Sequence, residues 1–271
     1  MQILRSYPEL KTCRTQITGK LGLVPTMGAL HEGHLALVRK MRELADAVMV
    51  SIFVNPTQFG PSEDFNKYPR NIESDLEKLE GLADYVYLPQ VKDIYPNGEK
   101  MTVKAGEAAQ GLESDFRPGH FDGVATVVSI LFDQTKPDLA IFGEKDYQQL
   151  MVIKELNSSV GILGLPTIRE PDGLALSSRN VYLSAEERKV APLLYKTLTE
   201  IRHPGPVPGS GSSSTDSGSS AKIPAQGRDD AIRKLEAAGF KVQYVAEHWG
   251  RLLVAVYLGK TRLIDNIPLN N

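Results

Sequence analysis

Short apolar runs alternate with segments of helical periodicity along most of the chain, and no other sequence feature limits the fold more. The runs lie at 21–25, 47–54, 83–89, 138–143 and 161–166. The run AVMVSIFV (47–54) is continuous and rich in β-branched residues, as in a parallel strand buried on both faces. After it, Ile72, Leu76 and Leu79 recur at helical spacing. This alternation predicts a parallel α/β sheet with right-handed crossovers, which binds ligands beyond the carboxyl ends of its strands.

The composition changes after residue 202. The segment 203–227 is rich in proline, glycine and serine and nearly free of large apolar residues, so it predicts a flexible linker. Beyond it, one helical pattern and two strand-like patterns follow, at 228–239, 240–248 and 251–259. We therefore predict a larger α/β domain over 1–183 and a smaller α+β domain over 184–271 that contains the linker.

Length and charge exclude several classes of protein. A chain of 271 residues with 41% hydrophobic content can bury the core of one large domain or two smaller ones. The net charge of −2 gives no basic footprint for nucleic acid, and no apolar run reaches the roughly 18 residues that span a bilayer. The N-terminus lacks the apolar core of a secretory signal. Cys13 is the single cysteine, which excludes an internal disulfide and favours a reducing cytosol.

The segment LVPTMGALHEGHL (23–35) is the most distinctive, because a strand-like run and a turn lead directly into a helical pattern. His31 and His34 could be zinc ligands, capping or surface residues, or donors to a phosphate. Zinc sites need a third ligand and usually place two histidines four residues apart, whereas the spacing here is three. A helix start offers free N–H groups and the positive end of the dipole, and Gly28 and Gly33 allow close approach. The location therefore favours the phosphate role.

Further polar residues follow other strands at the same predicted edge of the sheet. They are Asn55 and Gln58, then Gly143, Lys145, Asp146 and Gln149, and finally Ser177, Ser178 and Arg179. Each of them alone could be an ordinary surface, turn or capping residue. Together they supply positive charge, hydroxyls and amides, which suit a polyphosphate and a small polar substrate.

These motifs closely resemble those of the pantothenate synthetase (pantoate–β-alanine ligase) family of the HxGH nucleotidyltransferase superfamily. The resemblance is carried by PTMGALHEGH, SIFVNPTQF, RPGHFDGVATVV, FGEKDYQQL, DGLALSSRNVYLS and TRLIDN. It implies a Rossmann-like N-terminal domain, a smaller C-terminal domain that covers the active site, and a cytoplasmic homodimer. It also implies ATP-dependent condensation of pantoate with β-alanine through a pantoyl adenylate, with release of AMP and pyrophosphate. The expected partners are these small molecules, without nucleic acid or membrane.

The same resemblance gives roles to individual residues. It implies ATP contacts from Met27, Gly28, Ala29, Leu30, His31, Glu32, Gly33, His34, Gly143, Glu144, Lys145, Asp146, Ile168, Leu176, Ser177, Ser178 and Arg179. Gln58 resembles the glutamine that binds pantoate and β-alanine, and Gln149 the second pantoate glutamine. His34 matches the residue usually called the proton donor. Mg²⁺ is expected with ATP, and the sequence identifies no protein ligand for it.

The implied chemistry requires charge stabilisation more than a base. A carboxylate is already an ionised nucleophile at neutral pH, so its attack on the α-phosphate needs no general base. His31, His34, Lys145 and Arg179 are suited to stabilise charge as pyrophosphate departs, and we expect these four to be catalytic. The β-alanine amine must be neutral to attack the adenylate, and water, the substrate or a side chain could take its proton.

Two alternatives remain open. The chain could be another small HxGH nucleotidyltransferase with a different acceptor, or a non-catalytic nucleotide-binding relative. The second alternative is raised by departures from the family pattern: a short stretch between DYQQL and GLPTIRE, the segment 203–227, and a short connection between QYVAEHWG and RLLVAVYLG. Turnover that depends on pantoate would separate both alternatives from the main hypothesis.

Overall fold

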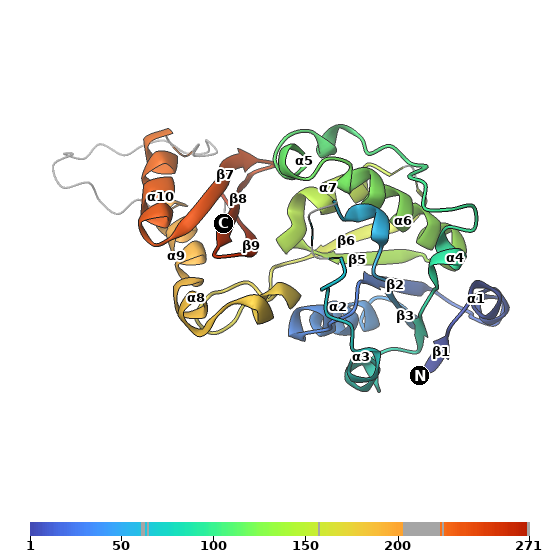
Figure 1. Ribbon diagram of the computed structural model, residues 1–271. Helices are drawn as coiled ribbons and strands as arrows, with labels where there is room; N and C mark the ends of the chain where they lie inside the picture. Colours follow the sequence, from blue (N-terminus) through green and yellow to red (C-terminus); the bar gives the residue numbers. More distant parts are fainter. Residues whose placement is uncertain (61–62, 64, 157, 203–222, 224, 270–271) are drawn as a thin grey trace, which may run out of the picture. The chain divides into compact units, whose positions relative to one another are not determined.

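The computed structural model describes residues 1–60, 63, 65–156, 158–202, 223 and 225–269. Contacts divide the chain into two units, Met1–Ile168 and Arg169–Asn271, whose elements are labelled in Figure 1. Each unit has its own sheet and its own hydrophobic core. The domain boundary expected from the sequence, at 183/184, stays a prediction.

The first unit is built on a parallel sheet, which confirms the predicted α/β, Rossmann-like class. In the described residues the sheet has six strands in the order β1-β4-β3-β2-β5-β6, and every neighbouring pair is parallel. The strands are β1 (Gln2–Leu4), β2 (Leu21–Thr26), β3 (Ala47–Ile52), β4 (Tyr85–Tyr87), β5 (Leu139–Gly143) and β6 (Gly161–Leu165). The α-helices are α1 (Tyr7–Arg14), α2 (Glu32–Arg42), α3 (Ile72–Leu79), α4 (Val91–Ile94), α5 (Glu113–Phe116), α6 (His120–Thr135) and α7 (Tyr147–Lys154). Short 3₁₀ helices are η1 (Pro56–Gln58), η2 (Glu107–Ala109) and η3 (Glu144–Asp146).

Burial on both faces explains the continuous apolar run in β3. Met49 and Val50 point to opposite faces of the sheet and both are fully buried. On one face the apolar stripes of α2 and α3 pack against the central strands. Figure 1 shows α6 and α7 on the other face. The sheet is therefore covered on both sides, and sheets of this kind bind ligands at the carboxyl ends of their strands.

The strand order reverses between β2 and β5. From β2 the chain proceeds through β3 to β4 on one side, whereas β5 pairs with the other side of β2 and continues to β6. Loops that leave two adjacent strands in opposite directions open a crevice at their carboxyl ends. The histidine segment follows β2 and the Lys145 segment follows β5. The topology thus brings together two segments that are far apart in the sequence.

The second unit is a small α+β fold, as predicted. Its antiparallel sheet has the order β7-β8-β9 in the described residues. Its elements are η4 (Ser178–Tyr182), α8 (Ala185–Val190), α9 (Leu193–Arg202), α10 (Ala225–Ala237), β7 (Phe240–His248), β8 (Arg251–Leu258) and β9 (Thr261–Pro268). Leu198, Leu235 and Val254 are among the fully buried residues that join α9, α10 and the sheet.

The predicted linker extends too far at its C-terminal end. Residues 203–222 and 224 lie outside the described residues, so the prediction stays a prediction there. Ile223 is buried in the core of the second unit and its N–H donates to Glu247 Oε1 at 2.7 Å. The helix α10 then begins at Ala225, before the predicted start at 228. The buried side chain of Ile223 and the start of α10 therefore mark the end of the segment.

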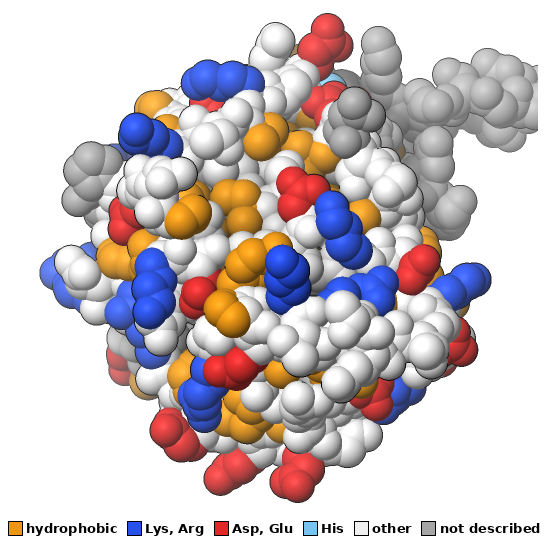
Figure 2. Space-filling model, turned by 90° about the vertical axis from the view of Figure 1, so that its right-hand side faces the viewer, with side chains coloured by type: hydrophobic (Ala, Val, Ile, Leu, Met, Phe, Trp, Pro, Cys, Tyr) orange, Lys and Arg blue, Asp and Glu red, His pale blue; other side chains and the backbone are white. Residues whose placement is uncertain are grey.

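The surface carries charged side chains of both signs. On the face that Figure 2 presents, acidic, basic and hydrophobic side chains are interspersed. Within the described ranges, every helix is too short or too polar to cross a bilayer.

Candidate active site

The loop between β2 and α2 turns through two residues of left-handed conformation. Gly28 has a φ of +82°, which glycine adopts freely, and Ala29 has a φ of +50°, which strains an L-residue by about 1 kcal/mol. Thr26 Oγ1 accepts a hydrogen bond from the Gly28 N–H at 3.3 Å and donates to Ser51 O at 2.9 Å. The start of the turn is thus fixed to β3, and its strained middle needs further support.

The buried carboxylate of Asp75 supplies that support from α3. Its Oδ2 accepts a hydrogen bond from the Ala29 N–H at 2.9 Å and its Oδ1 accepts one from the Leu30 N–H at 2.7 Å. Lys78, one helical turn later, donates its Nζ to Leu30 O at 2.8 Å. Asp75 is only 1% exposed. The helix α3 therefore holds both sides of the turn that precedes the histidines.

We expect Asp75→Asn to weaken ATP binding. The asparagine amide would direct its own N–H toward a backbone N–H, so one of the two buried bonds is lost and two donors face each other. A buried bond to a charged group contributes about 1.5–3 kcal/mol, which corresponds to a rise of about tenfold or more in the KM for ATP. Steady-state kinetics check this, with Glu77→Gln on the exposed face of the same helix as the control. An unchanged KM for ATP in a folded Asp75→Asn variant would show that the turn is stable without Asp75.

His31 and His34 cap the start of α2 with their imidazole rings. His31 is the N-cap residue, and its Nδ1 accepts a hydrogen bond from the Gly33 N–H at 3.2 Å. His34 Nδ1 accepts in the same way from the His31 N–H at 3.3 Å. A neutral imidazole that accepts through Nδ1 carries its hydrogen on Nε2. Each ring therefore caps the helix and still presents an Nε2–H donor, so the capping and phosphate-binding roles are compatible.

Desolvation of the half-buried rings keeps both neutral at physiological pH. It lowers the pKa of His31 to about 4, and the Lys145 ammonium adds to this effect. Burial also lowers the pKa of His34 to about 3, and the next cause is the neighbouring His31 ring, with the centroids 4.1 Å apart. Negative charge favours the protonated form of an imidazole. A phosphate near these rings would therefore raise both pKa values and strengthen the donation from Nε2.

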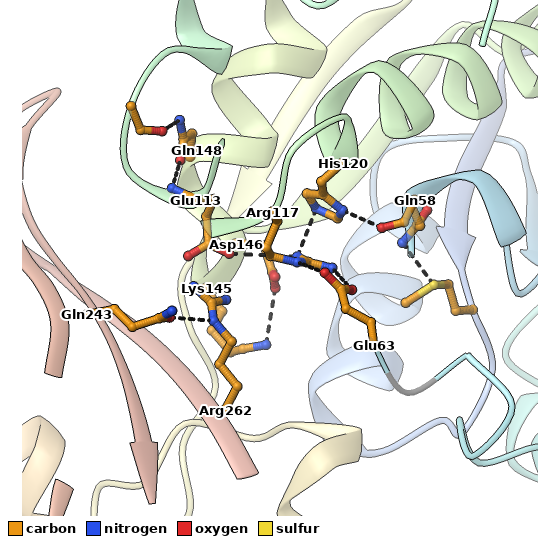
Figure 3. Close-up of polar contacts among 12 residues, drawn as sticks. Gln58, Glu63, Glu113, Arg117, His120, Lys145, Asp146, Gln148, Gln243 and Arg262 are labelled. Atoms are coloured by element: carbon orange, nitrogen blue, oxygen red, sulfur yellow. Dashed lines mark hydrogen bonds and ion pairs between the residues drawn. The ribbon is translucent and has the colours of Figure 1, made fainter. Parts of the chain in front are cut away.

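The end of β5 brings a cation to the same edge. Gly143 ends the strand, and Glu144, Lys145 and Asp146 form η3 before α7 begins. Lys145 Nζ lies 3.1 Å from Asp146 Oδ2 (Figure 3). The parallel pairing of β2 with β5 puts this segment and the histidines after neighbouring strand ends, and Lys145 lowers and Asp146 raises the pKa of both histidines. The structure thus joins the two predicted halves of the ATP site within the first unit.

Gln58 lies beside the same loop, and its amide orientation is fixed by its neighbours. Tyr95 donates its hydroxyl hydrogen to Asn55 Oδ1 at 2.6 Å, so Asn55 Nδ2 is left to donate to Gln58 Oε1 at 3.1 Å. Gln58 Nε2 then points to Met27 Sδ at 3.0 Å (Figure 3). A thioether sulfur is a weak acceptor, so a carboxylate or hydroxyl would be a better partner for this donor. Gln58 is thus a donor aimed at Met27 of the predicted ATP loop.

The two glutamines of DYQQ have different surroundings. Gln148 is buried, and its Nε2 donates to Ala108 O at 3.0 Å and to Gly111 O at 3.1 Å, while its Oε1 accepts from the Glu113 N–H at 3.0 Å. It therefore holds the η2–α5 segment. Gln149, the predicted substrate glutamine, is half-buried in the first turn of α7.

The remaining predicted ATP contacts lie at and beyond the end of the first unit. Ile168 is the last residue of that unit. Leu176–Arg179 belong to the second unit, where Ser177 caps η4 by accepting a hydrogen bond from the Arg179 N–H at 3.3 Å. Asn180 fixes the same turn by donating its Nδ2 to Ala175 O at 3.0 Å. These bonds hold the turn at η4, whereas the helix that begins near Ser184, α8, is capped by Ser184 itself.

The described residues contain no group of three or more His, Cys, Asp or Glu side chains arranged to hold a metal ion. Mg²⁺ that accompanies a nucleotide usually binds through phosphates and water with at most one or two carboxylates. Such a nucleotide-carried ion is compatible with the donors present.

Two imidazole donors at a helix start, at the switch point of a parallel sheet, are typical of nucleotide-binding α/β enzymes with an HxGH motif. The sequence model of the pantoate-beta-alanine ligase family matches residues 2–268. The pantothenate synthetase of Rhodospirillum rubrum is 48% identical and that of Rhodopseudomonas palustris 46%, each with 98% of both chains covered. The chain therefore belongs to the pantoate–β-alanine ligase family, whose members form an amide bond.

Solved structures agree with this assignment. The structure of pantoate-beta-alanine ligase from Francisella tularensis, complexed with beta-gamma ATP and beta-alanine, has a TM-score of 0.86 and 36% identity, with 100% of this chain and 98% of that chain covered. Pantothenate synthetase from Thermus thermophilus has a TM-score of 0.83 and 39% identity, with both chains covered fully. Despite the departures in its sequence, the chain thus shares the fold of these family members.

Several residues that shape the site were not given a role from the sequence. Asp75 lies on the apolar stripe of α3 between Ile72 and Leu79, and a carboxylate at such a position is a signal that could have been used. His120 lies in the motif RPGHFDGVATVV, but its partner Gln58 is far away in the sequence, so the motif did not reveal its role. Tyr95, whose partner is Asn55, gave no comparable local signal.

Proposed function

We propose that this protein joins pantoate to β-alanine with cleavage of ATP to AMP and pyrophosphate, and that the crevice beyond β2 and β5 is its active site. One observation carries the proposal: His31 and His34 each present an Nε2–H donor at the start of α2, beside Lys145. The Gln58 donor adjoins this group through Met27. Membership of the pantoate–β-alanine ligase family supports the choice of substrates.

In the first step, a carboxylate oxygen of pantoate attacks the α-phosphorus of ATP and the bond to the β-phosphate oxygen breaks. The attacking group is already ionised, so the site has to stabilise the charge that spreads over the phosphoryl oxygens and the departing pyrophosphate. We assign this role to His31, His34, Lys145 and Arg179. The loop Met27–His34, the segment Gly143–Asp146, Ile168 and Leu176–Arg179 are the proposed ATP contacts.

In the second step, the neutral amine of β-alanine attacks the acyl carbon of the pantoyl adenylate. The bond from that carbon to the AMP oxygen breaks, AMP leaves, and the amine loses a proton. Gln58 would bind pantoate and β-alanine, and Gln149 would bind pantoate. The two histidines are half-buried and neutral, with pKa values far below that of an amine, so no residue is assigned as the base for this proton.

The test is an assay for AMP and pantothenate from ATP, pantoate and β-alanine. AMP and pantothenate should form in equal amounts and only when all three substrates are present. ATP binding without pantoate-dependent turnover would instead favour a non-catalytic nucleotide-binding protein. AMP formation with an acceptor other than pantoate would favour another HxGH nucleotidyltransferase.

Pantoate alone, without β-alanine, should let the enzyme exchange labelled pyrophosphate into ATP. Cys13 is buried, and burial raises the pKa of its thiol, so a thioester intermediate is disfavoured. Cys13→Ser should therefore leave the exchange intact, whereas Gln149→Ala should weaken it chiefly through a higher KM for pantoate. A requirement for β-alanine would count against a separate adenylation step, and a pantoyl group trapped on the protein would rule the adenylate out.

The proposal includes features that accompany the reaction. Mg²⁺ would bind with ATP, held mainly by phosphate oxygens and water, and it would neutralise charge on the leaving pyrophosphate. The protein would act as a homodimer in the cytoplasm. Its catalytic domain would extend over 1–183, and the smaller domain over 184–271 would cover the active site.

A further inference from the structure

A chain of side chains connects the backbone of Gln58 to residues outside the proposed substrate contacts. His120, the first residue of α6, is 7% exposed, and its Nδ1 lies 2.8 Å from Gln58 O. Its Nε2 lies 3.0 Å from Arg117 Nη1. The other two guanidinium nitrogens of Arg117 bind Glu63 at 2.8 Å and 2.7 Å, and Glu113 lies 3.7 Å from Nη1 (Figure 3).

These contacts fix the tautomer of His120. A carbonyl oxygen only accepts hydrogen bonds, so Nδ1 must carry the hydrogen that is donated to Gln58 O. A guanidinium only donates, so Nε2 must be the acceptor. Burial lowers the pKa of His120 to about 4, and the Arg117 charge adds to this effect, so the ring is neutral at pH 7. Arg117 thus ensures that Nδ1, not Nε2, carries the hydrogen.

The bond to Gln58 O matters because η1 is only a single turn. The Gln58 side chain is oriented by Asn55, but its backbone belongs to a 3₁₀ helix of three residues, from Pro56 to Gln58. Short 3₁₀ turns have few hydrogen bonds of their own. The His120 bond comes from 62 positions away in the sequence and ties this turn to the long helix α6.

We propose that His120 is a positioning residue for pantoate, which acts by holding the Gln58 backbone, and that Arg117 and Glu63 keep His120 in the tautomer that can do so. This inference rests on the proposed function, because it takes Gln58 as a pantoate contact. It follows that the affinity for pantoate depends on the Arg117–Glu63 ion pair as well as on the ring of His120.

Two substitutions of His120 separate its two bonds. Asparagine places an amide near the position of Nδ1 and can still donate to Gln58 O, whereas glutamine places its amide near Nε2 and keeps only the Arg117 contact. We expect His120→Gln to raise the KM for pantoate about tenfold, with the KM for ATP within about twofold of wild type. His120→Asn should bring the KM for pantoate back to within about threefold. Steady-state AMP formation measures both constants, and melting temperatures report on folding.

Glu63→Gln provides a second variant if His120→Gln does not fold, because Glu63 is partly exposed and its replacement preserves shape. It should raise the KM for pantoate about three- to fivefold and leave that for ATP unchanged. Equal rises in both KM values, an Asn variant as impaired as the Gln variant, or a folded Glu63→Gln with wild-type constants would each overturn the inference. Gln58→Ala tests the proposed function separately from this inference. An unchanged KM for pantoate in this variant would refute the proposed role of Gln58, and with it the positioning role of His120.

Discussion

Replacing His34 by alanine is expected to lower the rate of pantoyl-adenylate formation by about 10²–10³, the usual loss when one preorganised donor to developing charge is removed. The Nε2–H of His34 is available for this role because Nδ1 is already bound to the His31 N–H. The effect should appear mainly in kcat, since the bond strengthens as charge accumulates on the phosphoryl oxygens. Pyrophosphate exchange with pantoate measures the step directly.

The same substitution should leave the fold intact. It removes one capping bond at the start of α2, which contributes about 1 kcal/mol and corresponds to a few degrees of melting temperature. His248→Ala, at an exposed position at the end of β7, is the control and should retain wild-type exchange. Wild-type turnover of His34→Ala would refute the phosphate role. So would loss of activity on treatment with a zinc chelator while Mg²⁺ is in excess.

Features set by local sequence could be predicted well. The β-branched run at 47–54 forms β3, and the helical spacing after it forms α3. Such elements can be predicted because the spacing of apolar residues along the chain determines which of them share one face of a helix or strand. The turn and helix start around HEGH were located correctly, since Gly28 and the capping positions act within a few residues. The anion site that we expect at this helix start stays a prediction.

Features that depend on distant contacts could not be predicted. The three-residue strand β1 forms only because Gln2–Leu4 pair with β4 at the edge of the sheet, and its own periodicity is too short to detect. The third strand of the second unit, β9, is likewise defined by its pairing with β8. The bonds of Asp75 to the histidine loop join residues more than forty positions apart, and no local pattern encodes such a contact.

Replacing Gly123 by alanine is expected to destabilise the protein and impair pantoate binding, although helix propensity alone predicts the opposite. In a helix interior, Gly→Ala usually stabilises by about 1 kcal/mol. Here a Cβ on residue 123 would lie 2.5 Å from Thr57 O and 2.9 Å from Gln58 N. These are backbone atoms that cannot rotate away, so α6 and η1 would have to separate. Overpacking of this kind costs about 1–3 kcal/mol.

The separation would act on the site as well as on the fold. Asn55 donates its Nδ2 both to Gly123 O at 3.2 Å and to Gln58 Oε1, so a shift of α6 disturbs the group that orients the Gln58 amide. We expect a fall of several degrees in melting temperature and a rise of at least tenfold in the KM for pantoate, with a smaller change for ATP. Gly227→Ala in α10 is the matched control, because among the described residues a Cβ there meets the methyl groups of Ile223 and Ile201, at 3.3 Å and 3.5 Å, and no backbone atom. That control should be neutral or stabilising. If Gly123→Ala behaved in the same way, the close approach of α6 to η1 would not constrain the position of Gln58.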